Sequence, residues 1–331
     1  MNTETLSQYD AVVHAVGLID LSDRGKIEVT GPDRVSFLHS MISNEVAGLP
    51  EYAGRYGTFL TARGKMVSDF YYYRFPDFLL LDIDRSLLTK LLGELEKYII
   101  MEEVDLSDVS AGYSHFSLQG PESPKLLQDL FGESGPQEGF EIQQLDQPGG
   151  HVWLIRRPDL ADQGFELVCP AQMGSDLHAA IQQKGVALEM QELDEESWNV
   201  LRTEAWIPRF GIDMDETRYP MEARLDRAIS LTKGCYLGQE VVAKATHIGG
   251  VNNLLMGLKL DGGAPPAQGA RVLNEEGKEI GSVTSAVLSP RLDCPIAFAY
   301  LKRGFASAGS RCRVELSDGE AASAEIVERF L

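Results

Sequence analysis

Two segments of the chain share one pattern, and this repetition constrains the fold more than any other feature. Val-Thr-Gly-Pro-Asp at 29–33 is followed by Phe37 and Leu38, and 89 residues later Leu-Gln-Gly-Pro-Glu at 118–122 is followed by Leu126 and Leu127. Each segment is typical of a strand, a Gly-Pro break and an amphipathic helix. The pair Ser123-Pro124 is a suitable N-cap and first-turn residue for the second helix.

The parallel between the two segments continues downstream. Residues 78–83 and 165–169 predict strands, and the stretches 86–99 and 171–184 that follow them predict helices, the second ended by Gly185. Coincidence is the alternative explanation, since Gly-Pro after a strand is common. The ordered succession of matching elements favours a duplication. Two α+β units, each with strands and covering helices, follow from it.

The end of the chain has a different texture. After Gly249-Gly250, short β runs alternate with turns, and the clearest runs are 255–260, 271–273, 280–288, 296–301 and 313–316. This pattern predicts a small all-β domain, either a barrel or a jelly roll. A length of 331 residues is also too great for one ordinary core, so two or three domains are expected.

Charge and cysteine usage exclude several classes of protein. The net charge of −20 argues against binding of nucleic acid or of an anionic membrane. No apolar run approaches the roughly 20 residues that span a bilayer, and the first residues lack the pattern of a signal peptide. The cysteines form no C-x-x-C pair and the histidines show no metal-ligand spacing. We therefore expect a reduced, cytoplasmic protein without a metal site.

The motif Lys-Gly-Cys-Tyr-Leu-Gly-Gln-Glu at 233–240 indicates chemistry. The apolar residues after it predict a helix, and a thiol at a helix N-terminus beside the Lys233 ammonium would have its thiolate form favoured twice. The alternative is that Cys235 is a small buried hydrophobe, as free cysteines often are. The polar neighbours Lys233, Gln239 and Glu240 favour a reactive cysteine.

Asp69 is a second candidate. It precedes Phe-Tyr-Tyr-Tyr at 70–73, which predicts a buried strand that Asp69 opens. Such an aspartate is either a turn residue or, where apolar surroundings raise its pKa, a general base.

Trp198 and Arg202 lie four residues apart on a helix that Asp194 is predicted to cap, so they share one face. An aromatic plane beside a guanidinium suits a flat, anionic ligand. The alternative is that Trp198 packs with Leu201 and Ala205 in a core.

The motif at 233–240 resembles the K-G-C-[YF]-x-G-Q-E motif of the YgfZ family of tetrahydrofolate-binding proteins, which is linked to iron–sulfur cluster assembly and repair and is related to the aminomethyltransferase (T-protein) of glycine cleavage. The resemblance covers nearly the whole chain. It includes the first Gly-Pro segment with Asn44, the segment 64–69, the second Gly-Pro segment, and residues 201–222.

This resemblance implies a three-domain cloverleaf around a central folate channel. Two α+β domains, ferredoxin-like or Greek-key, interleave in sequence, and a C-terminal β-barrel completes the ring. The expected divisions are 1–50 with 112–188, 51–111 with 189–248, and 250–331.

The resemblance also implies roles for site residues. Asp69 matches the aspartate that takes a proton from tetrahydrofolate in T-proteins, and Glu166 matches a glutamate that holds the pterin, since a carboxylate accepts hydrogen bonds from its amino and ring N–H groups. Trp198 matches a folate-contacting tryptophan. The further residues expected to bind the folate are Arg202, Gln239 and Glu240, with Cys235 and Lys233 as reactive groups at the same site.

Departures from T-proteins favour the YgfZ branch. The T-protein segment Gly-Tyr-Thr-Gly-Glu-Asp-Gly is replaced by Leu-Ala-Asp-Gln-Gly-Phe at 160–165, tryptophan replaces an arginine at position 198, and Cys235 has no T-protein counterpart. We therefore expect a tetrahydrofolate-dependent accessory protein that serves iron–sulfur client enzymes or assembly factors. A stably bound cluster is not expected, because such clusters usually need four ligands. The alternatives are an aminomethyltransferase with Asp69 as base, and a folate-binding scaffold without chemistry.

Overall fold

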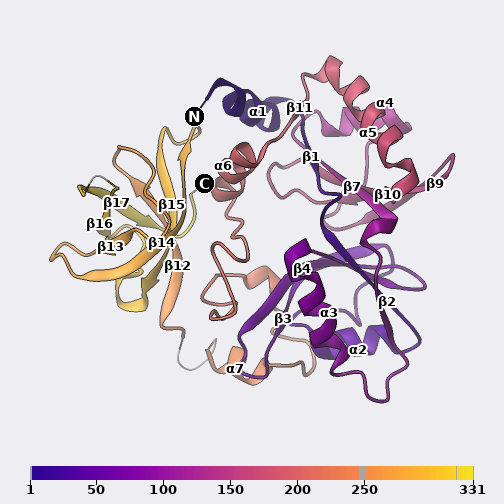
Figure 1. Cartoon of the computed structure of the whole chain (residues 1–331), viewed down its shortest axis with the longest axis horizontal. Coiled ribbons are helices and arrows are strands. Elements are labelled where there is room, and N and C mark those ends of the chain that lie inside the picture. Colours follow the sequence, from indigo (N-terminus) through magenta and orange to yellow (C-terminus); the bar gives the residue numbers. More distant parts are fainter. Residues whose placement is uncertain (1, 246–249, 318, 331) are drawn as a thin grey trace.

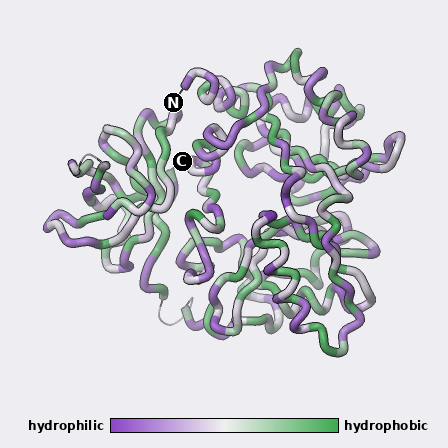
Figure 2. Tube along the Cα trace, in the orientation of Figure 1, coloured by the Kyte–Doolittle hydropathy of each residue, from purple (hydrophilic) through white to green (hydrophobic). Residues whose placement is uncertain are grey.

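The computed structural model describes residues 2–245, 250–317 and 319–330. Two sheets with their helices and a C-terminal barrel make three bodies, and the barrel lies apart from the two sheets, beyond the segment of helix α6 Glu195–Glu204 (Figure 1). The expected fold class, α+β with a terminal β-barrel, is confirmed. Hydrophobic residues gather along many of the strands, whereas outer loops of the barrel are largely hydrophilic (Figure 2). Every helix within the described residues is too short or too polar to serve as a membrane span.

The first sheet has six strands in the order β11-β1-β7-β10-β9-β8. Helices α4 and α5 pack together, with α5 on strands β7 and β10, whereas α1 contacts β1, β11 and α6. The bounds are α1 Thr3–His14, β1 Gly17–Asp20, β7 Tyr113–Gln119, α4 Ser123–Phe131, β8 Ile142–Gln147, β9 Gly150–Arg156, β10 Gly164–Pro170, α5 Ala171–Gly185 and β11 Gln191–Glu192.

The second sheet has five strands in the order β3-β4-β5-β2-β6. Its core contains Phe37 and Leu38 from α2 and the stripe Leu88, Leu91 and Leu95 from α3. The bounds are β2 Gly25–Thr30, α2 Arg34–Met41, β3 Ala53–Leu60, β4 Met66–Arg74, β5 Leu79–Ile83, α3 Leu88–Glu96 and β6 Asp105–Asp108.

The C-terminal domain is a closed barrel in the order β12-β15-β14-β13-β16-β17, which decides between the barrel and the jelly roll. The sequence did not indicate β17, because its alanines have little strand propensity. Pairing with β12 and β16 makes it a strand and closes the barrel. The bounds are β12 Asn253–Leu260, β13 Arg271–Leu273, β14 Glu279–Ser289, β15 Cys294–Lys302, β16 Arg311–Glu315 and β17 Ala321–Val327.

Two helices lie between the sheets and the barrel in sequence, α6 Glu195–Glu204 and α7 Gln239–Lys244. Asp194 caps α6 as predicted, because its side chain accepts a hydrogen bond from the Ser197 amide. Helix α6 also contacts β14 and β15, so it joins the barrel to the rest of the chain.

Both Gly-Pro breaks join a strand to a helix, β2 to α2 and β7 to α4. Gly31 and Gly120 have φ angles of 95° and 133°. A Cβ at Gly31 would lie 2.1 Å from the Glu103 carbonyl oxygen, and one at Gly120 would lie 2.5 Å from the Ala15 carbonyl oxygen. Glycine is therefore required at both breaks by conformation and by space.

Three local predictions need correction. Glu122 holds the N-cap position of α4 without a side-chain bond, and Ser123 is the first helical residue. Gly185 does not end the helical path, which continues through a 3-10 turn at 186–188 and stops at Glu189 with φ 53°. The stretch 86–99 is a 3-10 turn at 85–87 followed by the shorter helix α3.

The strand pairing divides residues 1–50 between the two sheets. Strand β1 pairs with β7 in the six-stranded sheet, whereas β2 pairs with β5 and β6 in the five-stranded sheet. The expected grouping of all of 1–50 with 112–188 therefore differs from the sheets at β2 and α2. The residues of β1 and β2 carry no signal of which partner strand each will meet.

Candidate functional site

A cavity of about 380 Å³ lies among the two sheets, helix α6 and the segment that follows α6. Aromatic side chains of Tyr56, Tyr71, Trp198 and Phe210 contribute to its wall. The acidic residues in the wall are Asp20, Asp69, Asp84, Asp159, Asp194 and Glu195, and the basic ones are Arg24, Arg157, Arg202, Arg209 and Arg227. Aromatic planes with charges of both signs suit a flat ligand that carries hydrogen-bond donors and acceptors.

Asp69 is the wall residue that the sequence predicted as a candidate base. It lies within β4, opposite Thr58 of β3, and not at the start of a strand as predicted. Its Oδ2 accepts a hydrogen bond of 2.6 Å from the Tyr56 hydroxyl. Burial raises the pKa of Asp69 above its ordinary value, although the Tyr56 bond opposes this. A carboxyl with a raised pKa that faces a cavity can exchange a proton with a ligand.

Tyr56 and Tyr71 face each other across strands β3 and β4, with ring centroids 5.1 Å apart. Arg227 lies over the Tyr56 ring at 5.0 Å, and Arg157 lies over the Tyr71 ring at 4.1 Å. The Tyr71 hydroxyl donates to Asp159 at 2.8 Å, as the Tyr56 hydroxyl does to Asp69. The wall thus contains two similar units, each with an arginine, a tyrosine and an aspartate.

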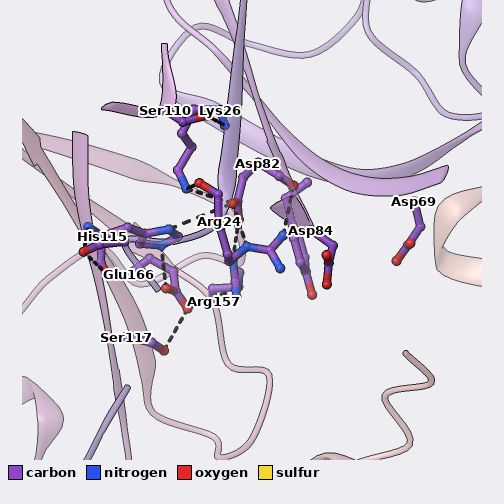
Figure 3. A network of polar contacts seen from close by, with 12 residues as sticks. Arg24, Lys26, Asp69, Asp82, Asp84, Ser110, His115, Ser117, Arg157 and Glu166 are labelled. Atoms are coloured by element: carbon purple, nitrogen blue, oxygen red, sulfur yellow. Dashed lines mark hydrogen bonds and ion pairs between the residues drawn. The ribbon is translucent and has the colours of Figure 1, made fainter. Parts of the chain in front are cut away.

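Behind this wall a buried ionic network joins the two sheets (Figure 3). Asp82 of β5 lies 2.7 Å from Arg24, 3.1 Å from Lys26 and 3.2 Å from Arg157. Although burial alone would raise it, these cations hold the pKa of Asp82 well below its ordinary value. Asp69 lies apart from the network in Figure 3. The network therefore fixes Arg157 and leaves Asp69 free to act on a ligand.

Glu166 belongs to this network and not to the cavity wall. It is fully buried, with one carboxylate oxygen 2.8 Å from His115 Nε2 and the other 2.9 Å from Ser117 Oγ and 3.1 Å from Arg157 Nε. Burial lowers the pKa of His115, so a neutral ring that donates from Nε2 fits this contact. The carboxylate that the resemblance assigned to the pterin is thus already occupied by protein donors.

Trp198 and Arg202 both line the cavity, as their shared helix face predicted, but they differ in availability. Trp198 is partly exposed. The Arg202 guanidinium is buried and bonds to Asp213 at 2.7 Å, to Ser285 of the barrel at 2.9 Å and to Asn199 at 2.7 Å. Arg202 therefore joins α6 to the barrel, and Trp198 is the member of the pair that faces the ligand space.

Lys233 also has a structural environment. Its buried ammonium donates to the carbonyl oxygens of His39, Ile42 and Asn44, at and just beyond the end of α2. Burial lowers its pKa to about 8. The side chain therefore satisfies carbonyl groups that the helix end leaves without partners.

The rest of the 233–240 motif lies outside the cavity wall. Cys235 is exposed and precedes α7 by four residues, so it is not within the first turn of a helix. Gln239 and Glu240 begin α7, and neither lines the cavity. The structure therefore brings together Asp69, Trp198 and Arg202 in the cavity wall, and it leaves Cys235, Gln239 and Glu240 elsewhere.

Several residues of the wall were missed by the sequence analysis, namely Tyr56, Asp159, Arg157 and Arg227. Only the pairing of β3 with β4 places Tyr56 beside Tyr71. Asp159 lies in a bend and Arg227 in a short 3-10 turn at Asp226–Ala228, and neither segment has a periodic pattern in the sequence. Within the described part of the chain, no group of three or more histidine, cysteine, aspartate or glutamate residues could hold a metal ion.

Comparison with known families agrees with this architecture. Residues 1–233 match the model of the GCVT N-terminal domain. Residues 254–331 match the model of the glycine cleavage T-protein C-terminal barrel domain. The chain belongs to the GcvT family. The first match spans both sheets and α6, so the cavity lies in the part of the chain that defines the family.

Named relatives in the family are aminomethyltransferases. The one from Chlorobium limicola is 27% identical over 315 residues, which cover 94% of this chain and 86% of that relative. The one from Desulfitobacterium hafniense is 28% identical over 325 residues, which cover 97% of this chain and 88% of that relative. The crystal structure of glycine cleavage system aminomethyltransferase T from Bartonella henselae has a TM-score of 0.89, covers 99% of this chain and 91% of its own, and is 23% identical. This last similarity establishes the fold.

Proposed function

We propose that this GcvT-family member binds tetrahydrofolate, or a one-carbon derivative of it, in the cavity and acts as an aminomethyltransferase with Asp69 as base. The observation that carries the proposal is a carboxyl of raised pKa in the wall of a cavity with aromatic planes. The aminomethyltransferases among the relatives support the transferase over the other readings. Trp198 supplies a partly exposed aromatic face for the ligand.

The residues fit a transfer to a reduced folate. Two folate nitrogens each form a bond to the one-carbon unit and each loses one proton, the first of them to Asp69. The carbon–sulfur bond to the lipoyl carrier and the bond from the carbon to the amino group break. Of the two protons, one ends on the carrier sulfur and the other on the amino group, which leaves as ammonia, so one methylene bridge forms on the folate. Tyr56 holds the Asp69 carboxylate in place through its hydroxyl.

Incubation with an aminomethyl-lipoyl carrier and tetrahydrofolate tests the transferase directly. We expect ammonia and methylene-tetrahydrofolate in equal amounts, and a fall of about 100-fold or more in rate for Asp69→Asn, as general-base catalysis contributes roughly 10²–10⁴-fold. Asp146→Asn, which changes a carboxylate outside the cavity wall, is the matched control. Absence of both products would exclude the transferase.

A second candidate function is the maintenance of iron–sulfur enzymes by a folate-binding accessory protein. The exposure of Cys235, at the centre of a motif like that of the YgfZ family, favours it. Cys235 is exposed and lies outside the cavity wall, so a client enzyme or assembly factor would have access to its thiol. In this version Lys233 supports the fold near the thiol.

Thiol chemistry and a cellular assay test this candidate together. Cys169 and Cys312 are buried, and burial raises the pKa of both to about 11, so Cys235 is expected to react fastest with a disulfide reagent. Cys235→Ser should remove the fast phase and lower the activity of [4Fe–4S] enzymes in cells. Cys294→Ser is the control. Full activity of those enzymes in the Cys235→Ser strain would eliminate the accessory function and leave Cys235 without a role.

A further inference from the structure

A buried Glu166 leaves the ligand without its expected carboxylate. Both Glu166 oxygens already receive hydrogen bonds from His115 and Ser117, and the Arg157 guanidinium lies against one of them. A tetrahydrofolate pterin carries an amino group and a ring N–H side by side, with a carbonyl oxygen beyond them. Such an edge is matched by an acceptor with a donor next to it.

Four of the six acidic residues in the cavity wall have other tasks. Asp20, Asp84 and Asp194 each accept a bond from the backbone amide two or three residues further along, as in turns and helix caps. Glu195 is largely exposed and pairs with Arg209. Asp20, Asp194 and Glu195 are also exposed, and Asp84 accepts two bonds from Ser86. Asp69 and Asp159 are instead the wall carboxylates bonded to the cavity tyrosines Tyr56 and Tyr71, so we take these two as the carboxylates that can meet a ligand inside the cavity.

Asp159 has one oxygen committed and one available. Its Oδ2 lies 2.8 Å from the Tyr71 hydroxyl and 2.8 Å from Arg157 Nε. Its Oδ1 has only the Arg227 guanidinium near it, at 3.8 Å, among the described residues. A carboxylate oxygen has about two lone-pair sites, so Oδ1 can receive N–H groups of a ligand.

Two guanidiniums lie beside Asp159, and one of them can serve as the neighbouring donor to the ligand. Arg157 is held by Asp82 and Glu166 from behind, and Arg227 lies over Tyr56 with about half of its side chain exposed. Arg227 accordingly has N–H groups to offer a carbonyl oxygen beside Asp159. A guanidinium in such a position donates in a fixed plane.

We propose that Asp159, and not Glu166, is the carboxylate that recognises the pterin edge, with Arg227 as the adjacent donor and Glu166 as a positioning residue for Arg157. This inference rests on the proposed binding of tetrahydrofolate. The two carboxylates then have different roles: Asp159 binds the pterin edge, and Asp69 accepts the proton from the folate nitrogen.

The test compares tetrahydrofolate with its 2-desamino analogue by calorimetric titration. The wild-type protein should prefer tetrahydrofolate by about 10-fold or more, since one hydrogen bond to a charged group is lost in the analogue. Asp159→Asn keeps an acceptor for Tyr71 but removes the carboxylate. It should bind tetrahydrofolate about 10- to 100-fold more weakly and show no preference between the two ligands.

Three controls make the result specific. Asp162→Asn changes an exposed residue of the same loop and should keep the wild-type preference. Asp159→Glu retains the charge and should recover part of the preference. Glu166→Gln should lower affinity for both ligands by the same factor, because it acts through Arg157. Circular dichroism of each variant shows whether it is folded, and Asp159→Glu serves as the second variant if Asp159→Asn is not.

Two outcomes would overturn the inference in different ways. If Asp159→Asn keeps the preference for tetrahydrofolate over its 2-desamino analogue, or if only Glu166→Gln abolishes that preference, another residue binds the pterin edge and this inference alone is wrong. If the wild-type protein binds neither ligand, the proposed function is wrong, and so is the inference.

Discussion

At the scale of the residue, the site depends on two tyrosines that present carboxylates to one cavity. Tyr56 and Tyr71 are cross-strand neighbours, and each donates its hydroxyl to one aspartate. The Tyr56 bond lowers the pKa of Asp69 against the larger effect of burial, which raises it. This balance decides at which pH Asp69 can accept a proton.

The first prediction concerns the Tyr56 bond. Tyr56→Phe removes a donor that favours the charged form of Asp69, so the pKa of Asp69 rises further. The pH at which Asp69 loses its proton, followed by carbon NMR of the side chain, should therefore move upward. Tyr71→Phe, which changes the bond to Asp159, is the control and should leave the Asp69 titration in place. An unchanged or lower Asp69 pKa in Tyr56→Phe would contradict this account.

The second prediction concerns the stability cost of Asp69. Because its pKa is higher in the folded protein, the folded state binds more protons, and the carboxylate lowers stability once the pH exceeds its ordinary value of about 3.9. Asp69→Asn removes that charge and keeps an acceptor for Tyr56. In urea unfolding at pH 7, Asp69→Asn should have a higher free energy of unfolding than the wild type, and the difference between the two proteins should shrink toward pH 4. If Asp69→Asn is less stable than the wild type at pH 7, the raised pKa of Asp69 is contradicted.

At the scale of the element, the sequence predicted strands and helices well where a regular pattern recurs. Both Gly-Pro breaks join the predicted strand to the predicted helix. Patterns failed where long-range pairing decides, as in β17, whose alanines become a strand only by closing the barrel. Asp69 was predicted to open its strand because the apolar run begins at Phe70, yet pairing with β3 extends β4 back to Met66.

The candidate site was predicted in part for the same reason. Trp198 and Asp69 are visible in a linear sequence as an aromatic on a helix face and a carboxylate beside an apolar strand. The role of Lys233 was not visible, since its partners lie about 190 residues away in the chain. Glu166 was assigned to the pterin from the resemblance alone, and its partners His115 and Arg157 meet it only through the sheet, so the sequence did not indicate its buried ionic environment.

The third prediction tests the contact of Lys233 with the end of α2. Lys233→Met removes three hydrogen bonds to carbonyl groups, so it should lower the free energy of unfolding by about 1–3 kcal/mol. Lys244→Met, whose ammonium is exposed and pairs with Glu240 at 4.0 Å, is the matched control and should cost about 0–0.5 kcal/mol. Equal effects of both substitutions in chemical denaturation would show that Lys233 does not support the helix end.

At the scale of the whole molecule, α6 connects the cavity to the barrel. Arg202 and Asp213 form a buried ion pair at 2.7 Å, and the hydroxyls of Thr284 and Ser285 in β14 donate to the other Asp213 oxygen. The same helix presents Trp198 to the cavity. Attachment of the barrel therefore sets the position of one wall of the cavity.

The fourth prediction tests this attachment. Arg202→Met leaves the Asp213 carboxylate buried without its cation, which should cost about 3–5 kcal/mol of stability. Amide hydrogen exchange should increase in β14 in this variant, because its contacts with α6 weaken. Arg209→Met, at an exposed ion pair with Glu195, is expected to cost about 0–1 kcal/mol. Unchanged exchange in β14 would show that the barrel is held by other contacts.

The fifth prediction, binding of tetrahydrofolate in the cavity, is the central claim, and calorimetric titration of the wild-type protein and of Trp198→Ala tests it most directly. We predict saturable binding of one ligand per chain by the wild type, and about 3- to 10-fold weaker binding by Trp198→Ala, because an aromatic contact is worth about 0.5–1.5 kcal/mol. Absence of binding by the wild type, or equal affinity of the two proteins, would contradict the claim that this cavity holds the folate.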